Sequence, residues 1–240
     1  MVQIEAIVFD VDGTLVDTAN FKNPNSGPGR LKKIIESLGY PIPDNINQRI
    51  KDCWAYGDLD NQIVQGPFGV PIEAAKLALE MWKEWDEREP CELLPGVERI
   101  PRMLQNAGFV TAILTSRGHQ SLSAMLHYHQ IQWHFHKVFS RERCFYKKPH
   151  RRAADELFDE LGRAFGIKPE NSAYLGDIPG DMRFAVGAGM ISLGTPTGLY
   201  SKEDLLAATD EEGNLLNIPK ENIVGSVADL EHWLRTYGHL

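Results

Sequence analysis

Cysteine is scarce in this chain of 240 residues, and the few cysteines follow no regular spacing. They are Cys53, Cys91 and Cys144, an odd number without a Cys-x-x-Cys pair. A disulfide framework needs paired cysteines in an oxidising compartment, so the sequence argues against one. We therefore expect free thiols and a cytoplasmic location.

Basic residues are outnumbered as well. The chain has 25 Lys and Arg against 33 Asp and Glu, a net charge of -8. Nucleic acids and anionic membrane surfaces attract basic proteins, so neither is expected as the main partner. No apolar run approaches the ~20 residues of a membrane-spanning helix. The chain enters its first strand at once, so no signal peptide is expected, and there is no internal repeat or low-complexity tract.

After Gly96 the sequence alternates between the periodicities of strands and helices. Apolar segments predict strands at 109–114, 137–140, 172–176 and 190–193, and a further buried strand at 4–9. Helical spacing predicts helices at 97–107, 119–128, 151–165, 180–188, 202–208 and 227–236. Strand–helix alternation is typical of a parallel sheet with helices on both faces. We predict an α/β fold with a Rossmann-like, doubly wound parallel sheet.

A helical insert separates the first predicted strand from the rest of this pattern. Loop-forming sequences at 20–29 and 89–96 mark its ends. Between them, helical spacing relates Leu31, Ile34, Ile35 and Leu38, with Gly39 as a C-cap, and again Ile72, Ala75, Leu79 and Trp82. We therefore predict a core of residues 1–19 plus 93–240 and a small helical domain of residues 20–92.

Two aspartates stand where the first strand ends. Asp10 and Asp12 follow the apolar run at 4–9, and Gly13 then allows a sharp turn. Open α/β sheets bind their ligands at the carboxyl ends of the strands. Buried carboxylates stay charged only when a cation or several hydrogen-bond donors compensate them. We interpret the pair as part of a metal site; the alternative is that they only cap a helix or form a turn.

Three more motifs follow in order. The strand at 109–114 leads into Thr115 and Ser116, and Lys147-Lys148-Pro149 comes next. The strand at 172–176 ends in Gly176-Asp177, with Asp181 four positions on. If a helix begins near Pro179, a favoured first helical residue, both aspartates lie on the same side of that turn.

These four ordered motifs resemble those of the haloacid dehalogenase superfamily, and within it the phosphoglycolate phosphatase-like phosphatases. The resemblance covers nearly the whole chain, from the segment 9–17 to Ala188-Gly189-Met190. It implies that the insert is a helical cap. It also implies a phosphatase that hydrolyses a small phosphorylated metabolite, phosphoglycolate-like or a sugar phosphate; a homodimer is left open.

The resemblance further implies roles for the aspartates. Asp10 would attack phosphorus and form an aspartyl-phosphate. Asp12 would protonate the leaving alcohol and later take a proton from the attacking water. The metal would be held by Asp10, by the backbone carbonyl of Asp12 and by Asp177, with Asp181 as a ligand or a support. Oxygen ligands beside a phosphate favour Mg²⁺ as the cofactor.

Substrate contacts are expected from the two other motifs. Thr115 would donate a hydrogen bond to a phosphoryl oxygen, and Lys148 would supply positive charge to the phosphoryl group and to Asp10. Ser116, which stands where relatives often have asparagine, is also expected to bind the substrate. Three alternatives stay open: Thr115 caps the next helix, Lys147 replaces Lys148, or Asp181 only stabilises the start of its helix.

Several other side chains are weaker candidates. Arg117, Arg151 and Arg152 could contact an anionic substrate, although local salt bridges are favoured for the last two. In the insert, candidates for substrate contact are Arg49, Lys51, Trp54 and Tyr56. A zinc site built from His127, His129, His134 and His136 is disfavoured relative to packing near the surface.

Three rival functions remain. A sugar phosphomutase would use the same residues but return the phosphoryl group to its substrate. A haloacid dehalogenase would use Asp10 without needing Asp12 or a metal, so the presence of Asp12 weighs against it. A non-catalytic phospho-ligand-binding protein would have no reason to retain the whole set Asp10, Asp12, Thr115, Lys148 and Asp177.

Overall fold

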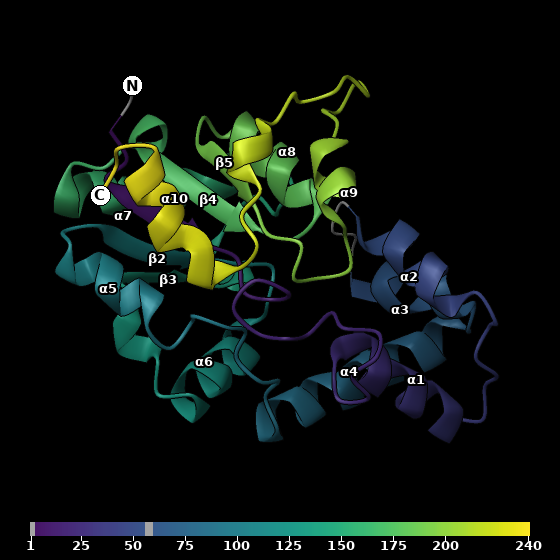
Figure 1. The fold of residues 1–240 in the computed structure, drawn as a ribbon. Coiled ribbons are helices and arrows are strands. Elements are labelled where there is room, and N and C mark those ends of the chain that lie inside the picture. Colours follow the sequence, from purple (N-terminus) through teal and green to yellow (C-terminus); the bar gives the residue numbers. More distant parts are fainter. Residues whose placement is uncertain (1–2, 56–59) are drawn as a thin grey trace.

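The computed structural model describes residues 3–55 and 60–240. Within these residues, five parallel strands form one sheet with the order β3-β2-β1-β4-β5, so the first strand lies at the centre (Figure 1). The strands are β1 (Ala6–Phe9), β2 (Val110–Leu114), β3 (Lys137–Phe139), β4 (Ser172–Gly176) and β5 (Ile191–Gly194). The predicted α/β fold with a doubly wound parallel sheet is confirmed.

Helices cover both faces of the sheet, and β1, β2 and β4 are buried along their whole length. One face packs against α5 (Ile100–Asn106), α6 (His119–Tyr128) and α10 (Leu230–Thr236). The other packs against α7 (Asp155–Phe165) and α8 (Pro179–Gly187). Strand β1 shows the alternation: Ile7 and Phe9 belong to the first apolar cluster, Ala6 and Val8 to the second.

The register of the sheet brings the motif residues to one edge. Phe9 pairs with Ile113 of β2 and with Leu175 of β4, so these three strands end at nearly the same level. The residues that follow are Asp10, Thr115 and Asp177. Because the strands are parallel, these side chains emerge together at the carboxyl edge of the sheet.

Residues 20–92 hold the helices α1 (Gly27–Ser37), α2 (Ile46–Trp54), α3 (Asp60–Phe68) and α4 (Ile72–Arg88), which we call the helical segment. The helical segment has an apolar cluster of its own, which includes Leu31, Ile35, Ile50, Val64 and Leu79. The rings of Trp54 and Trp82 stack beside it, with centroids 6.2 Å apart and an interplanar angle of 11°. Figure 1 shows these helices at one side of the sheet, with α4 close to α6.

The chain enters and leaves the helical segment at one place. Val16 and Leu93 form an antiparallel bridge. The amide of Asp17 donates to the carbonyl of Glu92 at 2.8 Å, and the amide of Leu94 donates to the carbonyl of Leu15 at 2.9 Å. The entering and leaving strands are therefore hydrogen-bonded to each other, and both continue directly into the core.

The boundaries correct several sequence predictions. The predicted loop at 20–29 is wrong over its last residues, because α1 begins at Gly27. Ser26 caps this helix by accepting a hydrogen bond from the amide of Gly29 at 3.3 Å, and Pro28 suits a first helical turn. The remaining differences are small. The first strand starts at Ala6, α5 starts at Ile100, and α9 (Lys202–Leu206) ends two residues before the prediction. Residues 151–154 and 227–229 form 3₁₀ turns before α7 and α10, respectively.

Two further sequence expectations can be compared with the structure. Cys53, Cys91 and Cys144 form no disulfide bond among the described residues. Among the described residues, no helix combines the length and the apolar character needed to cross a membrane.

Candidate active site

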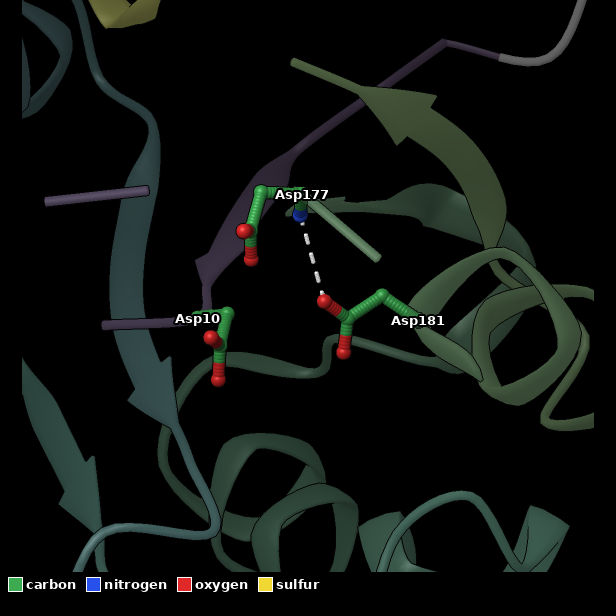
Figure 2. Close-up of side chains that lie close together, drawn as sticks. All are labelled: Asp10, Asp177 and Asp181. Atoms are coloured by element: carbon green, nitrogen blue, oxygen red, sulfur yellow. Dashed lines mark hydrogen bonds between the residues drawn. The ribbon is translucent and has the colours of Figure 1, made fainter. Parts of the chain in front are cut away.

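Three buried carboxylates converge at the carboxyl edge of the sheet. Asp10 follows β1, Asp177 follows β4, and Asp181 lies in the first turn of α8 (Figure 2). An oxygen atom from each lies within 4.8 Å of the others. All three residues are buried, with at most 6% of their surface exposed. The structure therefore brings together the three acidic side chains that the sequence placed in a metal site.

Glycines make room for two of these carboxylates. Gly13 has a φ of 73°, and a Cβ added there would lie 2.1 Å from the Oδ2 atom of Asp177. A Cβ at Gly176 would lie 2.3 Å from the Oδ2 atom of Asp181. Each distance is far below van der Waals contact, so a larger residue would displace a carboxylate from the cluster.

Asp181 serves two purposes through its two oxygens. Its Oδ2 atom accepts hydrogen bonds from the amides of Asp177 at 3.2 Å and Ile178 at 3.4 Å, which stabilise the start of α8. Its Oδ1 atom lies 2.8 Å from the ammonium group of Lys148. The structural role considered from the sequence is therefore present, and a contact with the cluster accompanies it.

Lys148 is the cation that reaches into the cluster. Its Nζ atom lies 2.7 Å from Asp10 Oδ1, 2.8 Å from Asp181 Oδ1 and 2.6 Å from the hydroxyl of Tyr174. That hydroxyl donates in turn to the backbone carbonyl of Leu114 at 2.9 Å. Lys147, the alternative to Lys148, instead donates to the carbonyl of Arg141 at 2.6 Å.

The cluster carries more negative charge than Lys148 can balance. Burial raises the pKa of Asp10 to about 6 despite the opposing effect of Lys148. Burial also raises the pKa of Asp177 well above its usual range, and the neighbouring Asp181 and Asp10 add to this shift. The pKa of Lys148 is raised because its attraction to Asp10 and Asp181 outweighs its desolvation. A further cation would relieve this repulsion between the carboxylates.

The donor set fits a hard divalent cation. Among the described residues, the group that could hold a metal consists of carboxylates and contains no histidine or cysteine. Mg²⁺ prefers such oxygen ligands, whereas zinc sites usually include histidine or cysteine. Of the four histidines considered for a zinc site, His127 and His129 lie 2.8 Å from the backbone carbonyls of Ser123 and Cys91, respectively.

A cavity of about 600 Å³ opens above the cluster, between the core and the helical segment. Its core side includes every predicted site residue: Asp10, Asp12, Thr115, Ser116, Lys148, Asp177 and Asp181. Thr115 accepts a hydrogen bond from the amide of Arg117 at 3.1 Å, and α6 begins after Gly118, so Thr115 is not the helix cap. The opposite wall includes the apolar residues Trp54, Ile63, Leu79 and Trp82 and the charged residues Lys83 and Asp86.

Asp12 lies outside the carboxylate cluster and is held by Arg117. The Nη2 atom of Arg117 donates to Asp12 Oδ1 at 2.6 Å, and Nε donates to Asp12 Oδ2 at 3.3 Å. Arg117 is buried, whereas the Asp12 side chain retains 42% of its exposure. The carboxylate of Asp12 is thus anchored from behind and open toward the cavity.

Arg117 also binds the helical segment. Its Nη1 atom forms an ion pair with Oδ2 of Asp86, near the end of α4. The other oxygen of Asp86 lies 3.5 Å from Nη1 of Arg30 on α1, and Arg30 Nη2 donates to the carbonyl of Glu89 at 2.5 Å. Burial raises the pKa of Asp86, and the two arginines oppose this shift. Arg30, Asp86, Arg117 and Asp12 thus form a row of successive ion pairs, which we call the ion-pair chain.

Sequence reasoning missed three of the residues just described. Asp86 follows Leu79 and Trp82 at helical spacing, which places it on the buried face of α4 and could have marked it. Arg30 precedes Ile34 by one turn in the same way. Tyr174 brings a hydroxyl into an apolar strand, and such a group needs a buried partner.

Several weaker candidates have contacts elsewhere. Arg49 donates to the carbonyl of Gly66 at 2.9 Å, and Lys51 lies 2.6 Å from Asp204. Arg152 forms the local salt bridge favoured from the sequence, at 2.7 Å from Asp155. Trp54 lines the cavity, and Tyr56 lies outside the described residues.

Comparisons with known proteins agree with this geometry. The model of the haloacid dehalogenase-like hydrolase family matches residues 4–189. The chain is 25% identical over 207 residues to the probable phosphatase IndB of Dickeya dadantii, covering 84% of this chain and 85% of that protein. It is 25% identical over 231 residues to a phosphoglycolate phosphatase of Vibrio cholerae, covering 91% and 98%. A crystal structure of a predicted phosphoglycolate phosphatase from Haemophilus somnus superposes with a TM-score of 0.72 at 18% identity, covering 97% and 98%.

Proposed function

The chain belongs to the haloacid dehalogenase-like hydrolase family, and on that basis we propose that it is a Mg²⁺-dependent phosphatase acting on a small phosphorylated metabolite. The observation that carries the proposal is the cluster of Asp10, Asp177 and Asp181 around Lys148 at the floor of the cavity. The curated relatives with phosphatase names support the same reaction class.

Asp10 is the proposed nucleophile. Its carboxylate would attack the phosphorus atom, form an aspartyl-phosphate and release the alcohol, and water would then hydrolyse this intermediate. Lys148, which is 2.7 Å from Asp10, would orient the nucleophile and balance charge on the phosphoryl oxygens. Thr115 and Ser116, on the same wall of the cavity, would bind the phosphoryl oxygens.

Asp12 is the proposed acid and base. It would give a proton to the leaving oxygen as the bond to phosphorus breaks, and later accept a proton from water. Its open side faces the cavity, where the leaving group would lie.

Asp10, Asp177 and Asp181 would hold Mg²⁺, with the backbone carbonyl of Asp12 as a further proposed ligand. When bound, Mg²⁺ supplies positive charge that neutralises the phosphoryl oxygens and the converging carboxylates. The protein contributes an oxygen-only site and a buried position for it.

The helical segment, residues 20–92, is proposed to be a cap that covers the substrate and excludes water. Its wall of Trp54, Ile63, Leu79 and Trp82 would contact the leaving group. These four apolar side chains favour an apolar or aromatic leaving group over a small polar one such as glycolate. We therefore propose that aryl phosphates and phosphate esters with a planar ring are better substrates than phosphoglycolate.

Phosphate release tests the proposal. The purified protein is assayed with phosphoglycolate, sugar phosphates, nucleoside monophosphates and phenyl phosphate, with Mg²⁺ and with EDTA. Release that requires both Mg²⁺ and Asp10 is expected. Loss of substrate without free phosphate, together with an isomeric sugar phosphate as product, would indicate a phosphomutase; tight binding without turnover would indicate a binding protein.

A further inference from the structure

The ion-pair chain connects the helical segment to Asp12 through alternating charges. Arg30 and Asp86 belong to the helical segment, and Arg117 and Asp12 belong to the core. The side chains of Arg30, Asp86 and Arg117 are 3%, 9% and 6% exposed, whereas that of Asp12 is 42% exposed. The first three residues of the ion-pair chain are therefore shielded from solvent, and Asp12 at its end is open to the cavity.

The guanidinium of Arg117 joins two carboxylates rigidly. Its Nε and Nη2 atoms bind both oxygens of Asp12, at 3.3 and 2.6 Å, while Nη1 binds Asp86 and also lies 3.3 Å from Ser121 Oγ. A guanidinium group is planar. The contact between Nη1 and Asp86 therefore restricts the plane in which Nε and Nη2 bind Asp12. The position of Asp86 therefore determines where Arg117 holds Asp12.

The position of Asp86 depends in turn on the seating of α4. This helix packs against α6 of the core, and Asp86 lies near its end. Arg30, on α1, holds the second oxygen of Asp86 at 3.5 Å. A displacement of the helical segment would therefore pull Asp86 away from Arg117.

We propose that Asp86, acting through Arg117, positions the Asp12 carboxylate for proton transfer to the leaving group. Asp86 and Arg117 are positioning residues. The proton itself passes from Asp12 to the leaving oxygen as the bond between that oxygen and phosphorus breaks. This inference rests on the proposed function, because it assigns a role within that reaction. It makes the acid–base residue competent only while the helical segment is seated on the core.

Two aryl phosphates of similar size provide the test. Phenolate is a poor leaving group that needs a proton, whereas 4-nitrophenolate leaves readily without one. The quantity measured is the ratio of kcat/KM for phenyl phosphate to kcat/KM for 4-nitrophenyl phosphate, with Mg²⁺. The variants are Asp86→Asn and Arg117→Lys; Asp12→Asn is the reference for lost acid catalysis, and Asp52→Asn is the matched control.

Asp86→Asn and Arg117→Lys are expected to lower the ratio about 10-fold, in the same direction as Asp12→Asn, since acid–base help is typically worth ~10²–10⁴-fold. Asp52, an exposed aspartate of α2 bound to Gln48 at 2.7 Å, should leave the ratio unchanged when replaced. Arg117→Lys keeps the buried positive charge, so it provides a second variant if Asp86→Asn does not fold.

An unchanged ratio in folded Asp86→Asn and Arg117→Lys would overturn the inference, even if both rates fell together, because that result indicates a structural role alone. A wild-type protein that hydrolyses neither ester would overturn the proposed preference for aryl phosphates, and one that releases phosphate from no member of the wider panel would overturn the proposed function. Crystal structures of wild type and Asp86→Asn would then decide the positioning claim. An Asp12 carboxylate that keeps its place and its contact with Arg117 in the variant contradicts it; a displaced one supports it.

Discussion

Two groups of charges lie next to Asp12, one of which, the ion-pair chain, ends at it, and they differ in charge balance. Below it, Asp10, Asp177 and Asp181 share one lysine, Lys148, so the cluster has an excess of negative charge. Beside it, the ion-pair chain alternates in sign and pairs two aspartates with two arginines. Burying unbalanced charge destabilises a fold unless a ligand compensates it.

The first group has an excess of one charge, whereas in the second each carboxylate is paired with an arginine. In the carboxylate cluster, burial and mutual repulsion raise the pKa values of Asp10 and Asp177, which is the behaviour expected of a site that gains from a cation. In the ion-pair chain, Asp12 and Asp86 raise the pKa of Arg117, so the arginine is firmly charged and already paired. The carboxylate cluster is therefore suited to binding a cation, and the ion-pair chain is suited to holding the helical segment against the core.

The largest expected effect follows from removing the nucleophile. Asp10→Asn should lower phosphate release by at least ~10³-fold, because the aspartyl-phosphate cannot form. The variant removes one of several converging carboxylates, so its melting temperature without metal should not fall. Phosphate release in Mg²⁺ and a thermal melt provide the two measurements. Turnover close to wild type would rule out the proposed mechanism.

A matched pair of cation deletions tests the charge comparison directly. Lys148→Met should destabilise the metal-free protein by about 3 kcal/mol, because it leaves buried carboxylates unpaired. Mg²⁺ should restore much of this loss, since it supplies charge to the same cluster. Arg30→Met should cost about 1–2 kcal/mol, because Arg117 still pairs with Asp86, and Mg²⁺ should not restore it.

Chemical denaturation of both variants, with Mg²⁺ and with EDTA, measures these effects. Equal recovery of the two variants in Mg²⁺ would contradict the distinction between the cluster and the chain. Arg235→Met provides a control, because Arg235 is exposed and its ion pair with Glu231 lies on α10. Exposed pairs of this kind contribute little, so its stability should change by less than about 1 kcal/mol.

The pH dependence of stability should also distinguish the two groups. Burial raises the pKa of Asp10 from 3.8 to about 6 in the metal-free protein. The folded state then binds this proton more tightly than the unfolded chain, so stability without metal should fall as the pH rises from about 4 through about 6. Mg²⁺ competes with the proton, so the stabilisation by Mg²⁺ should grow over the same interval.

Thermal melts at several pH values, with Mg²⁺ and with EDTA, measure that growth. Asp10→Asn should weaken it, while Arg30→Met should leave it in place. A stabilisation by Mg²⁺ that is as large at pH 4 as at pH 7 would show that the metal does not compete with the protons of this cluster.

The smallest expected effect concerns the apolar wall of the cavity. Trp82→Ala should raise the KM for phenyl phosphate about 5- to 10-fold with little change in kcat, because the ring would contact the leaving group but not the reacting atoms. Trp133→Ala is the matched control, since Trp133 is 80% exposed and does not line the cavity. An effect on KM as large in Trp133→Ala as in Trp82→Ala would argue against the proposed contact.

The sequence predicted the core well because its information is local. Each strand is a short apolar run, and the residue after it must lie at the carboxyl edge of a parallel sheet. This placed Asp10, Thr115 and Asp177 together, and the structure has them lining one cavity. Their chemical roles stay predictions, which the kinetic experiments address.

The helical segment was less predictable because its contacts are between distant residues. The pairing of Arg117 with Asp86, and of Asp86 with Arg30, joins positions 31 and 56 residues apart, and no local spacing encodes them. Helices α2 and α3 were not predicted either, because short helices depend on packing more than on periodicity. The start of α1 depends on Ser26, a cap inside a sequence whose composition indicates a loop.

The hydrogen-bonded crossing at Val16 and Leu93 makes the helical segment a single insertion with adjacent ends. Because the chain leaves and re-enters the core through one hydrogen-bonded bridge, the two ends of the helical segment lie side by side, as the ends of an inserted unit do. The crossing is thus a natural graft point. A helical insert from another protein would replace Arg30 and Asp86 as well, so it would need counterparts of both to keep Arg117 and Asp12 in place.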